Sequence, residues 1–203
     1  MKIIFVHGWG ADASYWDDLA VLVHGGKDAQ RVDLGYTDKQ AHYAGGPALY
    51  ITHSLGTLWA LQNRAQDMQG LIAINGFACF KTLVDTKVLT LMKKGLARDI
   101  ASQMHAFYCA ASMPQQGALH PDNLTLGLEW LAQEDARPVL GALEPSVMAL
   151  LSGQDNIVPL EAVRAQWDKA DVKICAPGGH NIPQTHAQWC ADHINAYIKD
   201  HST

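Results

Sequence analysis

The stretch Ala48-Leu49-Tyr50-Ile51-Thr52-His53-Ser54-Leu55-Gly56-Thr57-Leu58-Trp59-Ala60-Leu61-Gln62 decides the fold of this chain. Its first four residues form an apolar run typical of a strand buried on both faces, and residues 57–62 are typical of a helix. Ser54 stands at the join, two residues before Gly56, where a sharp strand-to-helix turn lifts a serine hydroxyl above the sheet edge. The helix N-terminus also presents free N–H groups to a developing oxyanion. The alternative is a serine that only caps the helix.

Three further apolar runs end in small-residue turns that carry a polar side chain. Residues 2–6 precede His7-Gly8-Trp9-Gly10, residues 147–151 precede Ser152-Gly153-Gln154-Asp155, and residues 172–175 lead to Gly178-Gly179-His180. Glycines after a strand let the backbone turn and leave an N–H free to point into a site. The chain order Ser54, Asp155, His180 is the order of an α/β-hydrolase catalytic triad.

The chain resembles the α/β-hydrolases, and among them it is similar to the pimeloyl-[acyl-carrier protein] methyl ester esterases of biotin synthesis. The similarity covers most of the chain. It rests on the Asp155 and His180 turns and on four further segments: 6–10 with Trp16, Asn75-Gly76-Phe77-Ala78-Cys79-Phe80, Leu124-Thr125-Leu126-Gly127-Leu128-Glu129-Trp130-Leu131, and Asp135-Ala136-Arg137. It implies a cytoplasmic serine carboxylic ester hydrolase that needs no cofactor and acts on an acyl methyl ester carried by acyl carrier protein.

The triad chemistry assigns a role to each of these side chains. Serine is a weak nucleophile at neutral pH, so Ser54 needs His180 as its base, and Asp155 would orient the imidazole. Asp33 also ends a strand, but in this fold an acid after the strand that precedes His180 is better placed, which favours Asp155.

The resemblance also implies residues that touch the substrate. The N–H groups of Trp9 and Leu55 would form the oxyanion hole. Trp9 would wall the pocket, and Met92, Leu96, Phe107 and Trp130 would line an acyl channel, although apolar residues of amphipathic helices are by default core residues. His7 is expected to order the oxyanion loop through a hydrogen bond, and His53 to be a packed neighbour.

Three departures from the family pattern stand out. Thr52 replaces the first glycine of Gly-x-Ser-x-Gly, and a β-branched residue there is expected to crowd the turn and open it slightly. Residues 35–46 replace an expected helix and are predicted to form a loop with at most one turn. The chain starts at the strand before the oxyanion loop, so a smaller sheet is expected.

The element pattern predicts an α/β fold with a mainly parallel sheet of about six strands and helices on both faces. Strands are expected at 2–6, 30–34, 47–53, 70–75, 146–152 and 171–176, and helices at 13–24, 55–66, 160–168 and 184–199. Residues 80–136 show helices without a strand, which predicts a helical lid over a core made of 1–79 and 137–203.

The beginning of the predicted lid is basic. Residues 77–100 carry five basic and two acidic side chains, a net charge of +3. Because the whole chain has a net charge of −5, its remaining residues together carry −8. At about 100° per residue, Lys87, Lys94 and Arg98 share a narrow arc opposite the apolar side chains. This arc is either a surface that attracts an acidic carrier protein or an ordinary solvated helix face.

Composition narrows the class of protein. The chain has 203 residues, 48% of them hydrophobic, enough for one domain with a sizeable core. Its net charge of −5 argues against a nucleic-acid binder, and no apolar run is long enough to cross a membrane. Cys79, Cys109, Cys175 and Cys190 form no CxxC and are expected to be reduced core thiols of a cytosolic protein. No histidine spacing predicts a metal site.

Three functions remain open from the sequence. The first is hydrolysis of methyl esters of carrier-bound acyl chains, and the second is hydrolysis of general small esters or thioesters. The third is ligand or partner binding without catalysis, which the complete serine, aspartate and histidine set disfavours.

Overall fold

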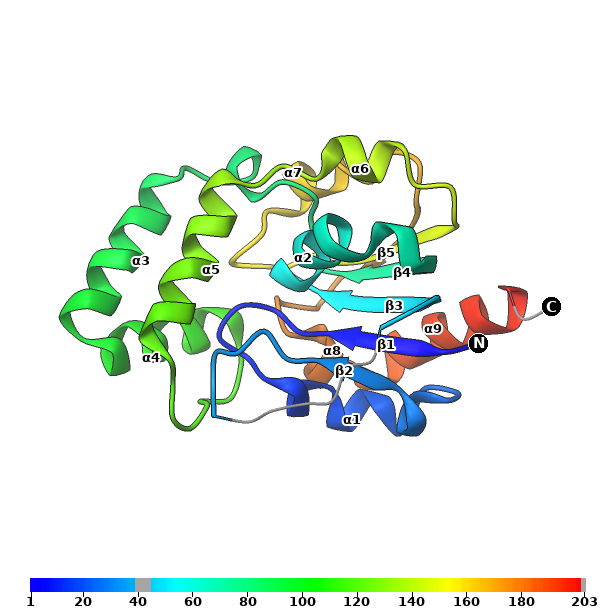
Figure 1. Cartoon of the computed structure of the whole chain (residues 1–203), viewed down its shortest axis with the longest axis horizontal. Coiled ribbons are helices and arrows are strands. Elements are labelled where there is room, and N and C mark those ends of the chain that lie inside the picture. Colours follow the sequence, from blue (N-terminus) through cyan, green and yellow to red (C-terminus); the bar gives the residue numbers. More distant parts are fainter. Residues whose placement is uncertain (39–44, 202–203) are drawn as a thin grey trace.

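The computed structural model describes residues 1–38 and 45–201, and these form a six-stranded parallel sheet (Figure 1). The strand order is β2-β1-β3-β4-β5-β6. The strands are β1 (Ile3–Val6), β2 (Gln30–Val32), β3 (Ala48–His53), β4 (Met68–Ile74), β5 (Val147–Ser152) and β6 (Asp171–Cys175). The predicted parallel sheet of six strands is confirmed, with strand ends shifted by no more than two residues.

The register of the sheet brings the carboxyl ends of its strands to one edge. Val6 pairs with Thr52, Thr52 pairs with Ala73, and Ser152 pairs with Cys175. Every residue of β3 is buried, which explains why its sequence is apolar without alternation. The turns that follow β1, β3, β5 and β6 therefore converge, and these are the turns that carry the candidate site residues.

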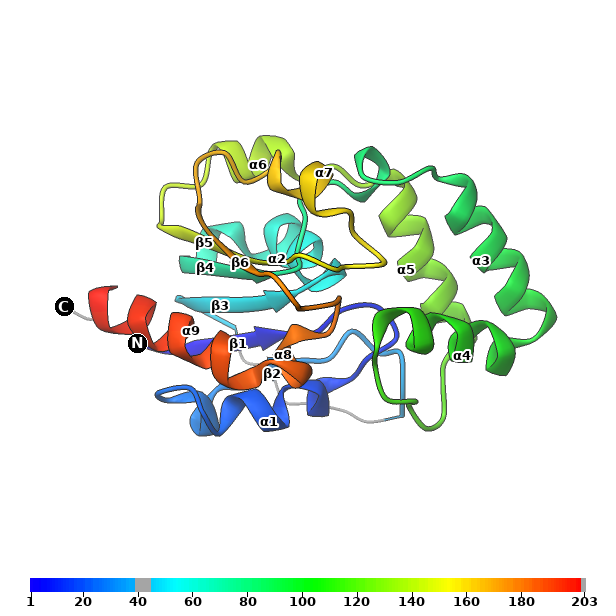
Figure 2. The ribbon, with the colours of Figure 1, turned by 180° about the vertical axis from the view of Figure 1, so that it is seen from behind.

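Helices cover both faces of the sheet. Figure 1 shows α2 on the near face, and Figure 2 shows α8 and α9 on the opposite face. The helix α1 packs against α8 and α9, and α6 packs against α2. The bounds are α1 (Asp17–Ala20), α2 (Leu55–Arg64), α6 (Arg137–Gly141), α7 (Leu160–Arg164), α8 (Ile182–Thr185) and α9 (Ala187–His201). Short 3-10 turns cover Ala13–Trp16, Gly26–Asp28, Ala65–Asp67 and Phe80–Thr82.

The helix predicted at 13–24 is wrong in its second half. The chain there forms the 3-10 turn Ala13–Trp16 followed by α1, which ends at Ala20. Gly25 has a φ of 78°, and a Cβ at position 26 would lie 2.4 Å from the carbonyl oxygen of Ala20. The chain therefore folds back on the end of α1 at these two glycines instead of continuing as a helix.

The helix predicted at 160–168 is also too long, because tertiary contacts end α7 at Arg164. The side chain of Gln166 bonds to the backbone of Ala78 and Cys79, and the indole N–H of Trp167 donates to the carbonyl oxygen of Gly76. The helix predicted at 184–199 is split into α8 and α9 around His186, whose backbone is not helical.

Three helices lie off the carboxyl ends of the strands, on the left of Figure 1. They are α3 (Lys87–Arg98), α4 (Ile100–Ala111) and α5 (Pro121–Gln133). Residues 80–136, all of which the structure describes, contain no strand, although Leu119 makes an isolated bridge with Thr37. The helical nature of this insertion is confirmed, while its action as a lid stays a prediction. Of the loop predicted at 35–46, residues 39–44 lie outside the described residues.

Candidate active site

Ser54 occupies a sharp turn between β3 and α2. Its φ of 52° and ψ of −125° fall in a region that non-glycine residues rarely adopt, at a cost of about 1–3 kcal/mol. Its N–H donates to the carbonyl oxygen of Ile74 at 3.1 Å. A Cβ at Gly56 would lie 2.4 Å from the carbonyl oxygen of His7, so only glycine lets α2 approach β1 this closely. The turn predicted at Ser54 is confirmed, and Gly56 makes it possible.

Thr52 fits this turn through a hydrogen bond. It is fully buried at the end of β3, and its Oγ1 lies 2.7 Å from Oγ1 of Thr57 in the first turns of α2. The two hydroxyls therefore satisfy each other between strand and helix. Thr52 thus serves as a polar link at the position of the first glycine in the Gly-x-Ser-x-Gly pattern.

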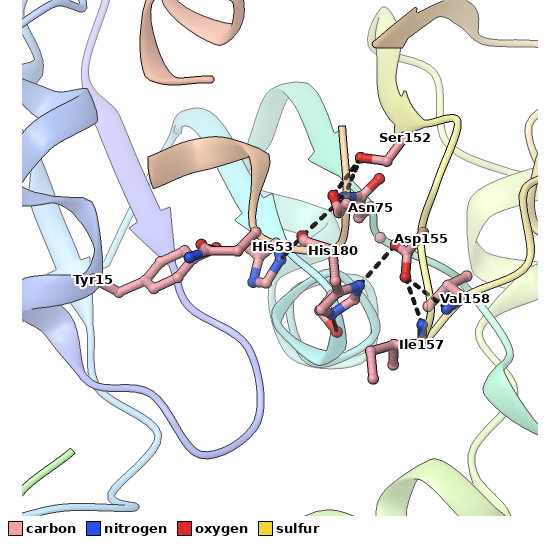
Figure 3. Close-up of polar contacts among 12 residues, drawn as sticks. Tyr15, His53, Asn75, Ser152, Asp155, Ile157, Val158 and His180 are labelled. Carbon is pink, nitrogen blue, oxygen red and sulfur yellow. Dashed lines mark hydrogen bonds and ion pairs between the residues drawn. The ribbon is translucent and has the colours of Figure 1, made fainter. Parts of the chain in front are cut away.

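Ser54, His180 and Asp155 form a continuous hydrogen-bonded chain. Nε2 of His180 lies 3.0 Å from Oγ of Ser54, and Nδ1 of His180 lies 2.8 Å from Oδ2 of Asp155, the contact drawn in Figure 3. The side chains of His180 and Asp155 are only 1% and 2% exposed. Because Asp155 accepts at Nδ1, the proton of neutral His180 resides on that nitrogen and Nε2 faces the serine as a proton acceptor.

The carboxylate of Asp155 is held by the backbone of its own turn. Its Oδ1 accepts N–H groups from Ile157 at 2.7 Å and Val158 at 2.9 Å, which leaves Oδ2 for His180. Asp33 has other partners than His180: its carboxylate accepts the N–H groups of Ala13 and Gly35. The structure therefore brings Asp155, as predicted, to the histidine.

The loop after β1 passes directly beside Ser54. A Cβ at Gly8 would lie 3.0 Å from Cβ of Ser54, so glycine is needed for this approach. His7 fixes the loop as expected, because its Nδ1–H donates to the carbonyl oxygen of Gly8 and its Nε2 accepts the N–H of Leu34. Leu55 is the first residue of α2, so its N–H has no acceptor within the helix. The oxyanion roles of Trp9 and Leu55 stay predictions.

His53 is a buried neutral side chain beside the candidate base. Its Nε2 lies 3.0 Å from the carbonyl oxygen of His180, so this nitrogen carries the proton. Its ring stacks on Tyr15 with centroids 4.8 Å apart. Burial, reinforced by the positive charge that His180 can carry, lowers the pKa of His53 well below its usual value. His53 therefore stays uncharged and acts as a hydrogen-bond donor.

The helix α4 is tied to both sides of the candidate site. The hydroxyl of Tyr108 donates to the carbonyl oxygen of Gly10 at 2.8 Å. The ring of Phe107 packs edge-on against Trp9 with centroids 4.7 Å apart. The side-chain amide of Asn181 donates to the carbonyl oxygen of Ser112, the residue that ends α4. These contacts fix α4 against the loops that carry Trp9 and His180.

Four of the predicted pocket and acyl-channel residues differ in accessibility. Trp9 and Leu96 are 3% and 4% exposed, whereas Met92 and Phe107 are half-buried, and all four belong to or pack against the core. Trp9 is further fixed by its indole N–H, which donates to the carbonyl oxygen of Leu124. Their contact with a substrate stays a prediction.

Two of the hollows among the described residues are separate from the triad. A groove of about 360 Å³ adjoins Leu55, and its apolar walls come from Leu34, Tyr36, Trp59, Leu126 and Trp130. A cavity of about 860 Å³ lies between α6 and α7, where Ser146 and Ala170 precede β5 and β6. The second hollow is thus at the sheet edge opposite Ser54 and has no part in its chemistry.

The apolar and basic sides of α3 are separated as predicted. Leu89 and Leu96 are buried, whereas Lys87, Lys94 and Arg98 are exposed. The helix ends at Arg98, because the extended Asp99 caps α4 by accepting the N–H of Ser102.

The predicted burial of the cysteines holds for three residues and is wrong for one. Cys79, Cys175 and Cys190 are buried, but Cys109 is exposed on α4, with its sulfur 3.6 Å from Nε2 of His105.

The described residues contain no cluster of three or more His, Cys, Asp or Glu side chains that would hold a metal ion. Across residues 1–38 and 45–201, every helix is too short or too polar to cross a bilayer.

Comparison with known proteins identifies the fold. No protein-family model and no curated protein sequence matches the chain. An esterase from Exiguobacterium antarcticum superposes with a TM-score of 0.81 at 14% identity, covering 98% of this chain and 92% of the esterase. A bromoperoxidase from Bacillus anthracis superposes with a TM-score of 0.79 at 12% identity, covering 98% and 91%. The chain has the α/β-hydrolase fold.

A third structure agrees with this identification. A thermophilic esterase from Thermogutta terrifontis has a TM-score of 0.75 at 15% identity and covers 100% of this chain and 91% of its own. Identities this low support the α/β-hydrolase fold and leave substrate and activity to be argued from the site.

Some polar residues around this candidate site were not identified from the sequence. Asn75 and Ser152 bond to the backbone around His180, and Tyr108 bonds to the loop that carries Trp9. Asn75 and Ser152 each end a predicted strand, so the convergence of strand ends was an available signal. Tyr108 lies on a helix far along the chain, and no local pattern points to its contact.

Proposed function

We propose that this protein is a cytoplasmic serine carboxylic ester hydrolase that cleaves the methyl ester of pimeloyl-acyl carrier protein in biotin synthesis. The observation that carries the hydrolase assignment is the hydrogen-bonded chain from Oγ of Ser54 through His180 to Asp155. A binding protein has no need of this arrangement, whereas acyl transfer by serine requires it.

The geometry suggests a two-step reaction. His180 takes the proton of Ser54 as Oγ attacks the ester carbonyl, and then gives it to the departing methoxide. Asp155 stabilises the imidazolium that forms between these steps. The N–H groups of Trp9 and Leu55 bind the oxyanion, each lowering the barrier by about 3 kcal/mol. Water, activated by the same histidine, then releases the free acid, so these residues need no cofactor.

A comparison of two substrates tests this function. We expect the protein to hydrolyse both p-nitrophenyl acetate and pimeloyl-acyl carrier protein methyl ester, with a higher kcat/KM for the carrier-linked ester. Hydrolysis of the small ester alone supports a general esterase, the second candidate. If the protein hydrolyses neither ester, the catalytic assignment is rejected.

The surface of α3 supports the choice of a carrier-linked substrate. Lys87, Leu91, Lys94 and Arg98 follow one another at spacings of four, three and four residues, so they share one face of the helix. The Lys87 side chain is 88% exposed and Leu91 is 65% exposed. A basic face around an exposed apolar side chain matches a partner that combines acidic and apolar groups. Lys93 lies off this face, with its ammonium group 3.6 Å from the carboxylate of Glu129, and the ammonium group of Lys87 lies 3.8 Å from the exposed carboxylate of Asp85.

Charge reversal on α3 is expected to affect only the carrier-linked substrate. Replacing Lys87, Lys94 and Arg98 with glutamate should raise KM for the carrier-linked ester by about 10-fold or more, since each reversed charge repels the acidic partner. The kcat/KM for p-nitrophenyl acetate should stay near wild type. Added salt should slow the carrier-linked reaction of wild type, because exposed charges are screened beyond about 8 Å at physiological ionic strength.

A matched variant separates local from global charge. Lys27, Lys169 and Lys199 are exposed and lie outside α3, so their reversal to glutamate gives the same change in net charge. This control should keep the wild-type KM for the carrier-linked ester. Equal losses in both triple variants would reject α3 as the docking face, and no loss in the α3 variant would leave a general esterase with a solvated helix.

A further inference from the structure

Asn75 occupies an unusual backbone position at the end of β4. Its φ is 44°, it is 2% exposed, and its N–H donates to the carbonyl oxygen of Leu150 at 2.8 Å. Asparagine tolerates a positive φ better than most non-glycine residues. The turn directs the Asn75 side chain toward the loop that carries His180, as Figure 3 shows.

The amide of Asn75 contacts the backbone of His180 and of the residue before it. Its Nδ2 lies 2.9 Å from the carbonyl oxygen of His180, 3.1 Å from that of Gly179, and 2.7 Å from Oγ of Ser152. Carbonyl oxygens only accept hydrogen bonds, so the amide nitrogen must face them. Ser152 completes the group because its hydroxyl donates to the carbonyl oxygen of Gly179 at 2.7 Å.

These donors act on a segment with little stiffness of its own. Gly178 and Gly179 directly precede His180, and glycine restricts the backbone less than any other residue. The His180 carbonyl also accepts the Nε2–H of His53 at 3.0 Å. The His180 backbone is thus held from β4 by Asn75 and from β3 by His53, while its ring contacts Ser54 and Asp155.

We infer that Asn75 is a positioning residue for the proposed base: its amide fixes the His180 backbone at the place from which the imidazole reaches both Ser54 and Asp155. This inference rests on the proposed hydrolase function. Asn75 has no direct contact with Ser54 or Asp155 through this amide, so its effect on the reaction passes through His180.

The variant Asn75→Gly tests this role. Glycine adopts a φ of 44° without strain, so the substitution removes the amide and leaves the turn intact. We expect kcat for p-nitrophenyl acetate to fall about 10²-fold, the loss typical of a misplaced reacting group, with KM nearly unchanged. We also expect the downfield proton NMR signal of His180 Nδ1–H to broaden or disappear, because that proton reports the contact with Asp155.

Three further variants make the test specific. Asn195→Ala removes another amide that bonds to backbone, at Leu22 and His24, and should keep wild-type kcat and the downfield signal. Ser152→Ala should give a smaller loss than Asn75→Gly. Asn75→Asp retains size and tolerance of positive φ but turns a carboxylate toward two carbonyl oxygens, and should lose the most.

The inference is overturned if folded Asn75→Gly retains both wild-type kcat and the His180 proton signal. If Asn75→Gly fails to fold, Ser152→Ala with unchanged kcat and an unchanged signal overturns it equally. A wild-type protein without esterase activity would refute the proposed function instead, and the proton signal of the variants would still decide whether Asn75 positions His180.

Discussion

Ser54→Ala is expected to lower kcat for ester hydrolysis by about 10⁴–10⁶-fold, the size of loss found when a serine nucleophile is removed. The fold should be retained, because the substitution removes one hydrogen bond to His180, worth about 1 kcal/mol. Steady-state hydrolysis of p-nitrophenyl acetate and thermal unfolding of the same preparation measure both effects.

A glycine variant provides the control for backbone strain. Ser54→Gly should be as inactive as Ser54→Ala, yet it should be the more stable of the two, because glycine alone accepts a φ of 52° and a ψ of −125° without cost. About 1 kcal/mol of released strain would raise Tm by about 2–4 °C in a chain of this size. A Ser54→Ala protein with most of its activity would remove Ser54 from the mechanism.

His180→Ala is expected to be as damaging as Ser54→Ala, and the double variant should be no worse than either, because the residues act as one unit. Asp155→Asn should lose about 10³–10⁴-fold, since the amide can present an N–H to Nδ1 and favour the wrong imidazole tautomer. The measurement is kcat/KM for p-nitrophenyl acetate across the four variants.

Asp33→Asn is the matched control for the acid. Asp33 follows β2 and accepts backbone N–H groups from Ala13 and Gly35. The carboxylate that contacts His180 is that of Asp155. The Asp33 variant should therefore keep activity within a few-fold of wild type while losing some stability. An inactive Asp33→Asn together with a nearly wild-type Asp155→Asn would reverse the assignment of the acid.

The parallel sheet and the three candidate triad residues could be predicted because both depend on local patterns. Apolar runs such as Ile3–Val6 and Val147–Ser152 mark strands buried on both faces, and the turns after them must meet at one sheet edge. Ser54, Asp155 and His180 each lie in such a turn, so their convergence follows from strand order and direction.

Some helix ends were harder to predict, because contacts distant in the sequence set them. The end of α7 depends on Gln166 and Trp167 binding residues 76–79, with separations of 88 and 91 positions for Ala78 and Gly76. The contact of Tyr108 with the loop that carries Trp9 is of the same kind, as it joins residues 98 positions apart. No hydrophobic period or capping signal contains this information.

The central claim is that Ser54 is a nucleophile activated by His180, and covalent labelling with diethyl p-nitrophenyl phosphate tests it most directly. Attack by Oγ of Ser54 on phosphorus releases p-nitrophenol and leaves a stable diethylphosphoryl serine. Fragmentation of the tryptic peptide 40–64 then locates the label. We predict one label per chain on Ser54 in wild type, with a stoichiometric burst of p-nitrophenol, and none in His180→Ala. A wild-type protein that hydrolyses esters while Ser54 stays unlabelled, or that carries the label on another residue, would contradict the account.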